Sequence, residues 1–154
     1  MRKIFSIRLI ICIVALAMAL GVGIFFTYTL VLRTEYKNAA LEMNEPFKQY
    51  SSVTLRKGDE TFSVPTDQVE YYNMFLLDRN TAVFSKKRVP ETKETITLDF
   101  GREQLSFTGL EDGSAIAITW KTPSDEKHYI VRSSTTFMQL NAYYTNCRRK
   151  YKKE

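Results

Sequence analysis

The sequence predicts an α+β fold: an N-terminal transmembrane helix followed by a small domain with an antiparallel meander sheet of about 5–7 strands. Three observations lead to this prediction. The 24 residues of 9–32 carry no charged side chain. From residue 51 onward, apolar and polar residues alternate with period two, which is typical of half-buried strands. Near the C-terminus the apolar period changes to three and four residues, which indicates a helix.

The apolar run 9–32 is long enough to cross a membrane. As a helix it would measure roughly 36 Å, whereas a hydrocarbon core is about 30 Å thick. The segment 1–8 before it contains Arg2, Lys3 and Arg8. Because compact basic segments stay on the cytoplasmic side, we expect a single-pass protein of the cell membrane with a cytoplasmic N-terminus and an extracytoplasmic domain.

Small residues within this run allow two further interpretations. Ala15 and Ala17, or Ala17 and Ala19, fit the small-x-small pattern of signal-peptide cleavage. Cleavage there would leave an apolar stub on the mature protein, so we expect an uncleaved signal-anchor. The four-residue spacings of Ala15 with Ala19, and of Ala17 with Gly21, also make these residues candidates for helix packing within the membrane.

The segment 33–50 reads as a stalk. Its apolar residues Ala39, Ala40, Leu41 and Met43 are too thinly spaced for a full apolar face, and Pro46 should end any helix. We expect two or three helical turns that continue the anchor, and then a linker. The folded domain is predicted to occupy 51–154.

The domain begins with a predicted β-hairpin over 53–64, in which Val53 and Leu55 alternate with polar neighbours. Asp67 precedes Glu70 by three residues, the spacing of a capping box, and so predicts a helix from about Asp67 to Arg79. A short strand is expected near 81–85.

A four-stranded meander and a final helix complete the predicted domain. The strands are expected near 96–100, 105–107, 116–120 and 128–132, with a turn at Glu111 to Ser114. Ser133 or Ser134 is expected to cap the final helix, whose apolar face contains Phe137, Leu140, Tyr144, Cys147 and Tyr151. Seven strands with a closing helix also resemble pleckstrin-homology-like barrels. An open sheet with both helices on one face is the other arrangement that this order allows.

Charge is concentrated at the two ends of the chain. The net charge is +5, but 33–147 contains 14 basic and 16 acidic residues. We therefore expect no nucleic-acid binding, because a binding face should be built on the folded body. The C-terminal cluster is instead a candidate contact for a protein partner, anionic lipid or a wall polymer. The candidate contact residues are Arg148, Arg149, Lys150, Lys152, Lys153 and Tyr143.

No pattern in the sequence indicates catalysis, a metal site or a cofactor. His128 is the single histidine, and Cys12 and Cys147 should lie in the membrane and the domain respectively, so they are not expected to pair. We predict a non-catalytic, membrane-anchored extracytoplasmic binding module of the cell envelope, acting through a protein partner or self-association. Alternatives are an accessory subunit assembled through its transmembrane helix and, less strongly indicated, a small envelope hydrolase.

Overall fold

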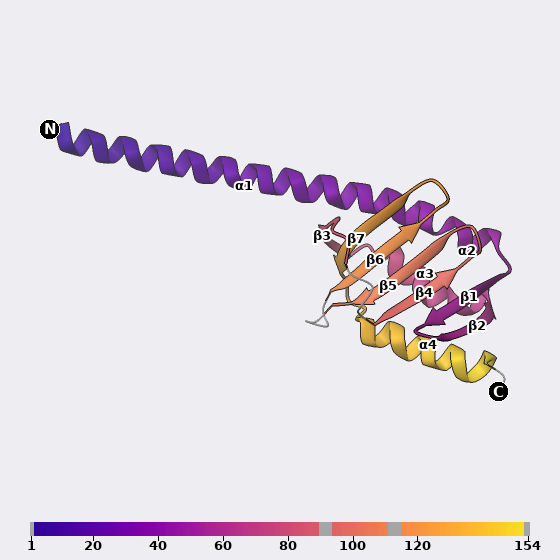
Figure 1. Ribbon diagram of the computed structural model, residues 1–154. Coiled ribbons are helices and arrows are strands. Elements are labelled where there is room, and N and C mark those ends of the chain that lie inside the picture. Colours follow the sequence, from indigo (N-terminus) through magenta and orange to yellow (C-terminus); the bar gives the residue numbers. More distant parts are fainter. Residues whose placement is uncertain (1, 90–93, 111–114, 153–154) are drawn as a thin grey trace.

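A computed structural model of the chain describes residues 2–89, 94–110 and 115–152, and shows an α+β domain at the end of one long helix (Figure 1). The elements are α1 (Arg2–Met43), α2 (Glu45–Gln49), β1 (Ser52–Lys57), β2 (Glu60–Pro65), the 3-10 helix η1 (Thr66–Val69), α3 (Glu70–Leu76), β3 (Ala82–Ser85), β4 (Thr95–Asp99), β5 (Gln104–Gly109), β6 (Ile116–Lys121), β7 (Glu126–Arg132) and α4 (Phe137–Tyr151). The predicted fold class is confirmed. The turn expected at 111–114 lies outside the described residues.

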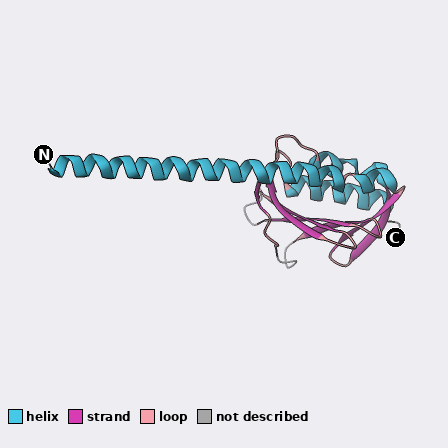
Figure 2. Ribbon diagram, turned by 90° about the horizontal axis from the view of Figure 1, so that it is seen from above, coloured by secondary structure: helices cyan, strands magenta, loops and turns pink. Residues whose placement is uncertain are grey.

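The seven strands form one antiparallel sheet in the order β2-β1-β4-β5-β6-β7-β3. β2 and β3 are its two edges, so the sheet is open and the barrel alternative is wrong. The chain crosses the sheet after β3, because β4 returns to pair with β1 while β3 pairs with β7 at the far edge. Figure 2 shows why the sheet does not close: it curves around helices that occupy one of its faces.

The core lies between this face of the sheet and the C-terminal part of α1, α3 and α4 (Figure 2). Alternate strand residues such as Leu55, Leu98 and Phe107 point into it and are fully buried. The opposite face is polar and partly exposed. Hydroxyl groups pair across its strands, as in the hydrogen bond of 2.9 Å between Thr97 and Ser106.

Helix α1 has two parts that differ in burial. Its apolar part is exposed up to Val31, and the helix is long and apolar enough to cross a membrane, as expected of a membrane anchor or a signal sequence. The structure differs from the expected stalk in the segment that follows. Leu32, Tyr36, Ala39 and Met43 are buried in the domain core, and the short helix α2 replaces the expected linker.

The reason for this difference is the shape of the packed surface. Residues at 32, 36, 39, 40 and 43 share one helical face. This narrow stripe is enough to bury one side of the helix in the domain core. The Tyr36 ring contacts the Tyr129 ring edge to face, with 5.3 Å between centroids, and its hydroxyl donates a hydrogen bond of 3.3 Å to the Leu76 carbonyl.

Both expected helix caps are wrong. No side chain caps α3, because a 3-10 turn follows Pro65 and delays the start of the α-helix to Glu70. At α4 the cap is Thr136, which makes a capping box with Gln139. Ser133 lies in the turn before the helix, where its hydroxyl accepts a hydrogen bond of 2.9 Å from the Thr135 N–H.

Thr136→Ala should lower the free energy of unfolding by about 1 kcal/mol, because it removes the side-chain acceptor of the capping box. Ser134→Ala is the matched control. The free energy of unfolding of this variant should change by no more than about 0.5 kcal/mol, because the exposed Ser134 makes only a hydrogen bond of 3.4 Å with Asp78. Urea unfolding of both variants in detergent checks this. Equal losses in the two variants would contradict the assignment of the cap.

Candidate functional site

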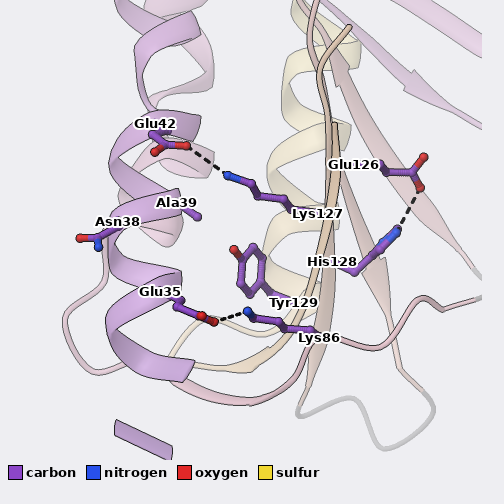
Figure 3. Close-up of a pocket in the computed structure, with 9 residues that line it drawn as sticks. All are labelled: Glu35, Asn38, Ala39, Glu42, Lys86, Glu126, Lys127, His128 and Tyr129. Carbon is purple, nitrogen blue, oxygen red and sulfur yellow. Dashed lines mark hydrogen bonds and ion pairs between the residues drawn. The ribbon is translucent and has the colours of Figure 1, made fainter. Parts of the chain in front are cut away.

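A groove separates the C-terminal half of α1 from β7 (Figure 3). We call it the α1–β7 groove, and its volume is about 480 Å³. Its lining residues are Glu35, Asn38, Ala39 and Glu42 of α1, Lys86 after β3, and Glu126, Lys127, His128 and Tyr129 of β7. Figure 3 shows the strand seen along its edge, with Lys127 and Tyr129 pointing toward α1 and Glu126 and His128 pointing to the other side.

The groove exists because β3 is shorter than its neighbour. β3 pairs with β7 only at Ile130, Val131 and Arg132, with a register irregularity before Ser85. The chain then leaves the edge of the sheet at Lys86. Among the described residues, 126–129 therefore pair with β6 alone. Such a strand presents backbone N–H and C=O groups along its free side, which is a template for a further strand.

Ion pairs bridge the groove at two points. Lys86 pairs with Glu35, and the Lys127 ammonium lies 3.3 Å from the Glu42 carboxylate. Between them the buried Tyr129 ring forms the floor. Burial raises the pKa of Tyr129, and the neighbouring Glu35 and Glu42 raise it further, so the phenol stays neutral at physiological pH. The walls are thus charged and the floor is aromatic.

A second cavity of about 490 Å³ continues the groove past Glu42 and Lys127, which line both. It adds Glu45, Glu103 and Asp125, together with the Trp120 ring. The Trp120 indole donates a hydrogen bond of 3.2 Å to Glu103 and lies beneath the Lys127 ammonium. Apart from Glu126, which points to the other side of β7, the lining residues of the two cavities include five carboxylates against two ammonium groups. The combined surface is therefore acidic.

His128 joins two other polar side chains on the outer face of the sheet. Its Nδ1 lies 3.2 Å from the Thr119 hydroxyl and its Nε2 lies 3.2 Å from Glu126. An acid, an imidazole and a hydroxyl in this order resemble a nucleophilic triad. However, Thr119 lies in the middle of β6 and pairs on both sides with Ser106 and His128, so its own N–H belongs to the sheet ladder. The arrangement fits a cross-strand polar contact.

The predicted basic cluster lies at the end of the domain away from the apolar half of α1 (Figure 1). Arg148 and Lys152 both pair with Glu60, at 2.6 and 3.0 Å, and Lys150 donates a hydrogen bond of 2.9 Å to Gln68. The hydrogen bond from Lys152 and the nearby Arg148 lower the pKa of Glu60. Arg149 is exposed, and Lys153 lies outside the described residues. Part of the cluster therefore stabilises the contact between α4 and β2.

Tyr143 is half-buried rather than fully outward. Its ring stacks on Tyr71 with 5.0 Å between centroids, and its hydroxyl donates a hydrogen bond of 2.7 Å to the Gln68 carbonyl. The neighbouring residues Tyr72 and Tyr144 are buried. Much of the Tyr143 side chain is thus occupied by contacts within the domain.

The predicted helix-packing residues Ala15, Ala17, Ala19 and Gly21 lie on the exposed part of α1. Within the described residues no second helix lies beside this part (Figures 1 and 2). Cys12 is exposed there and Cys147 is buried in the domain, so the two do not pair. No group of His, Cys, Asp and Glu side chains in the described part of the chain could hold a metal ion.

Comparison of this chain with protein-family models, curated proteins and solved structures finds no match. The site therefore rests on geometry alone. Sequence reasoning missed Glu35, Asn38 and Glu42, although their spacing of three and four residues places them on one helical side. That spacing was the available signal. It becomes informative only once the neighbouring stripe is known to be buried.

Proposed function

We propose that the chain is a non-catalytic binding module of the cell envelope, anchored by one membrane span, with its N-terminus in the cytoplasm and its domain outside. Residues 9–31 carry no charge, and all of them except the half-buried Thr29 are exposed in the structure, which suits a lipid environment. The basic segment before them favours the cytoplasmic side for the N-terminus.

We further propose that the module binds an extended, basic segment of a partner protein in the α1–β7 groove. The unpaired edge of β7 at 126–129 is the observation that carries this proposal. An extended peptide placed there would gain main-chain hydrogen bonds as an added strand. The five carboxylates other than Glu126 that line the groove and its continuation favour lysine or arginine side chains on that peptide.

The geometry also supports a division of roles between the two ends of the domain. The α1–β7 groove lies beside the helix that leads to the membrane, whereas the basic cluster of α4 lies at the far end (Figure 1). We propose the exposed cations there, such as Arg149, as a secondary contact for an anionic wall polymer. Contact with lipid of the membrane that holds α1 is less compatible with this placement.

A short fluorescent peptide of alternating lysine and valine tests the groove. The full chain in detergent should bind it, and anisotropy should show weaker binding as salt increases. Glu42→Lys combined with Glu45→Lys should weaken binding by roughly tenfold or more, since each like-charge contact raises the free energy of the complex. Glu70→Lys, an exposed charge reversal on α3 outside the groove lining, is the matched control and should have little effect.

A peptide methylated at alternate backbone nitrogens separates strand addition from simple charge attraction. It keeps the charges but loses the donors that an added strand needs. We expect its binding to fall sharply. Equal affinity for the methylated and unmethylated peptides, or an equal effect of the Glu70 and Glu42 variants, would contradict binding at the edge of β7.

A further inference from the structure

A further cavity, separate from the α1–β7 groove and its continuation, lies between β3 and the outer end of the apolar part of α1. We call it the membrane-proximal cleft, and its volume is about 550 Å³. On one side it is lined by Phe25, Phe26 and Leu30 of α1, and on the other by Ala82 and Phe84 of β3. Arg33 lines it where α1 enters the domain. Its surface is thus mainly apolar, with a cation at one end.

The apolar side chains around this cleft are unusually exposed for a contiguous group. Phe25, Phe26 and Leu30 are each more than 60% exposed, and Phe84 is 51% exposed. Scattered apolar residues on a surface need no explanation, but a contiguous apolar patch marks a contact surface. The patch is continuous with the apolar part of α1, so the medium that covers α1 also reaches Phe84.

The length of the apolar helix sets where the cleft would lie relative to the membrane. Residues 9–28 already measure about 30 Å, the thickness of the hydrocarbon core. Tyr28, at the end of that length, would lie at the membrane surface, where aromatic residues are favoured. Residues of β3 line the same cleft as Phe25 and Arg33. With residues 9–28 across the hydrocarbon core, β3 would therefore lie at the level of the lipid headgroups and upper acyl chains. Figure 1 shows β3 at the end of the sheet nearest the apolar half of α1.

Two cationic side chains lie beside the apolar patch on the domain side: Arg33, which lines the cleft, and Arg132. Arg33 donates a hydrogen bond of 2.9 Å to the Arg79 carbonyl, and both side chains belong to exposed residues. The Arg132 guanidinium lies over the Phe84 ring, 5.3 Å from its centroid. Arginine next to an apolar surface suits the phosphate of a lipid whose chains cover that surface.

We propose that the membrane-proximal cleft binds a phospholipid with an anionic headgroup, taken from the leaflet on the domain side of the membrane that holds α1. Its upper acyl chain lies against Phe25, Phe26 and Phe84, and its phosphate lies near Arg33. The domain is therefore seated on the membrane surface with β3 against the lipid. This inference rests on the proposed membrane anchor but not on the peptide groove.

The test places a spin label at the cleft in the full chain. Ala82→Cys, in a background with Cys12→Ala and Cys147→Ala, keeps Phe84 in place. Ser63→Cys, on an exposed position of β2, is the matched control. In phosphatidylcholine vesicles containing phosphatidylglycerol, the label at 82 should be accessible to oxygen and protected from a water-soluble nickel reagent, whereas the label at 63 should be exposed to nickel. Equal nickel exposure at 82 and 63 would overturn the proposal.

Lipid charge gives the second readout. Nickel protection at position 82 should be greater with phosphatidylglycerol than with phosphatidylcholine alone, and Arg33→Gln should remove that difference. Equal nickel protection in both lipids would contradict the proposal that the bound headgroup is anionic. Flotation of the vesicles separates the proposed anchor from the proposed lipid site. A chain that does not float with the vesicles would contradict both proposals. A chain that floats but whose label at position 82 is exposed to nickel would contradict only the lipid site.

Discussion

A chain that begins at Ser51 is expected not to fold, whereas a chain that begins at Val31 should form a stable domain. The shorter chain retains all seven strands but loses the helical face that contributes Leu32, Tyr36 and Met43 to the core. Removing one buried side chain of this size costs about 2–5 kcal/mol, and a domain of this length has only about 5–15 kcal/mol of total stability. Circular dichroism and urea unfolding of the two chains would measure the difference.

A single substitution tests the contribution of the buried face of α1 in the full chain. Tyr36→Ala should lower the free energy of unfolding by about 3–5 kcal/mol, because the ring is buried against Tyr129. Lys37→Ala changes the next residue, which is exposed, and should cost less than about 0.5 kcal/mol. A chain from Ser51 that unfolds cooperatively at the same urea midpoint as the chain from Val31 would show that α1 only touches a domain that folds without it.

Three arginines in the centre of the apolar run should abolish membrane integration. Leu16→Arg, Met18→Arg and Leu20→Arg each cost about 2.5–3.5 kcal/mol at the centre of a spanning helix. The combined variant should be extracted from membranes by alkaline carbonate, whereas the unchanged chain should resist extraction. Isoleucine at the same three positions is the control and should leave extraction unchanged.

The mass of the membrane-bound chain distinguishes an anchor from a cleaved signal sequence. An anchor keeps residues 1–32, so the extracted protein should have a mass that includes them. A chain that starts after Ala17 or Ala19 would contradict the uncleaved anchor. Carbonate-resistant binding of the arginine variant would show instead that the domain, rather than the span, holds the protein to the membrane.

The fold was largely predictable because its signals are local. Alternation identified the strands around Leu55, Leu98 and Ile118, and all of them lie in the sheet. The caps at Asp67 and Ser133 were mispredicted for a local reason too. Several residues near each helix start can accept the same backbone hydrogen bond, and the turn geometry before the helix selects among them.

The candidate site was not predictable, because its parts are distant in sequence. Glu42 and Lys127 form an ion pair across 85 positions, and Lys86 reaches Glu35 only because β3 pairs at the far edge of the sheet. The free edge of β7 depends on how long β3 is relative to its partner. That relation is a property of strand pairing, and no pattern within either strand encodes it.

The sequence by itself determined the apolar helix, the strand order along the chain and the absence of any recognisable catalytic motif, since periodicity and charge are readable residue by residue. The tertiary structure alone decided that α1 continues past Leu32 into the core, that the sheet stays open, and that β3 lies beside the end of the apolar helix. These features depend on which surfaces approach closely enough to exclude water. Which surfaces are buried depends on the packing of the whole domain. The same packing determines where the α1–β7 groove and the membrane-proximal cleft lie.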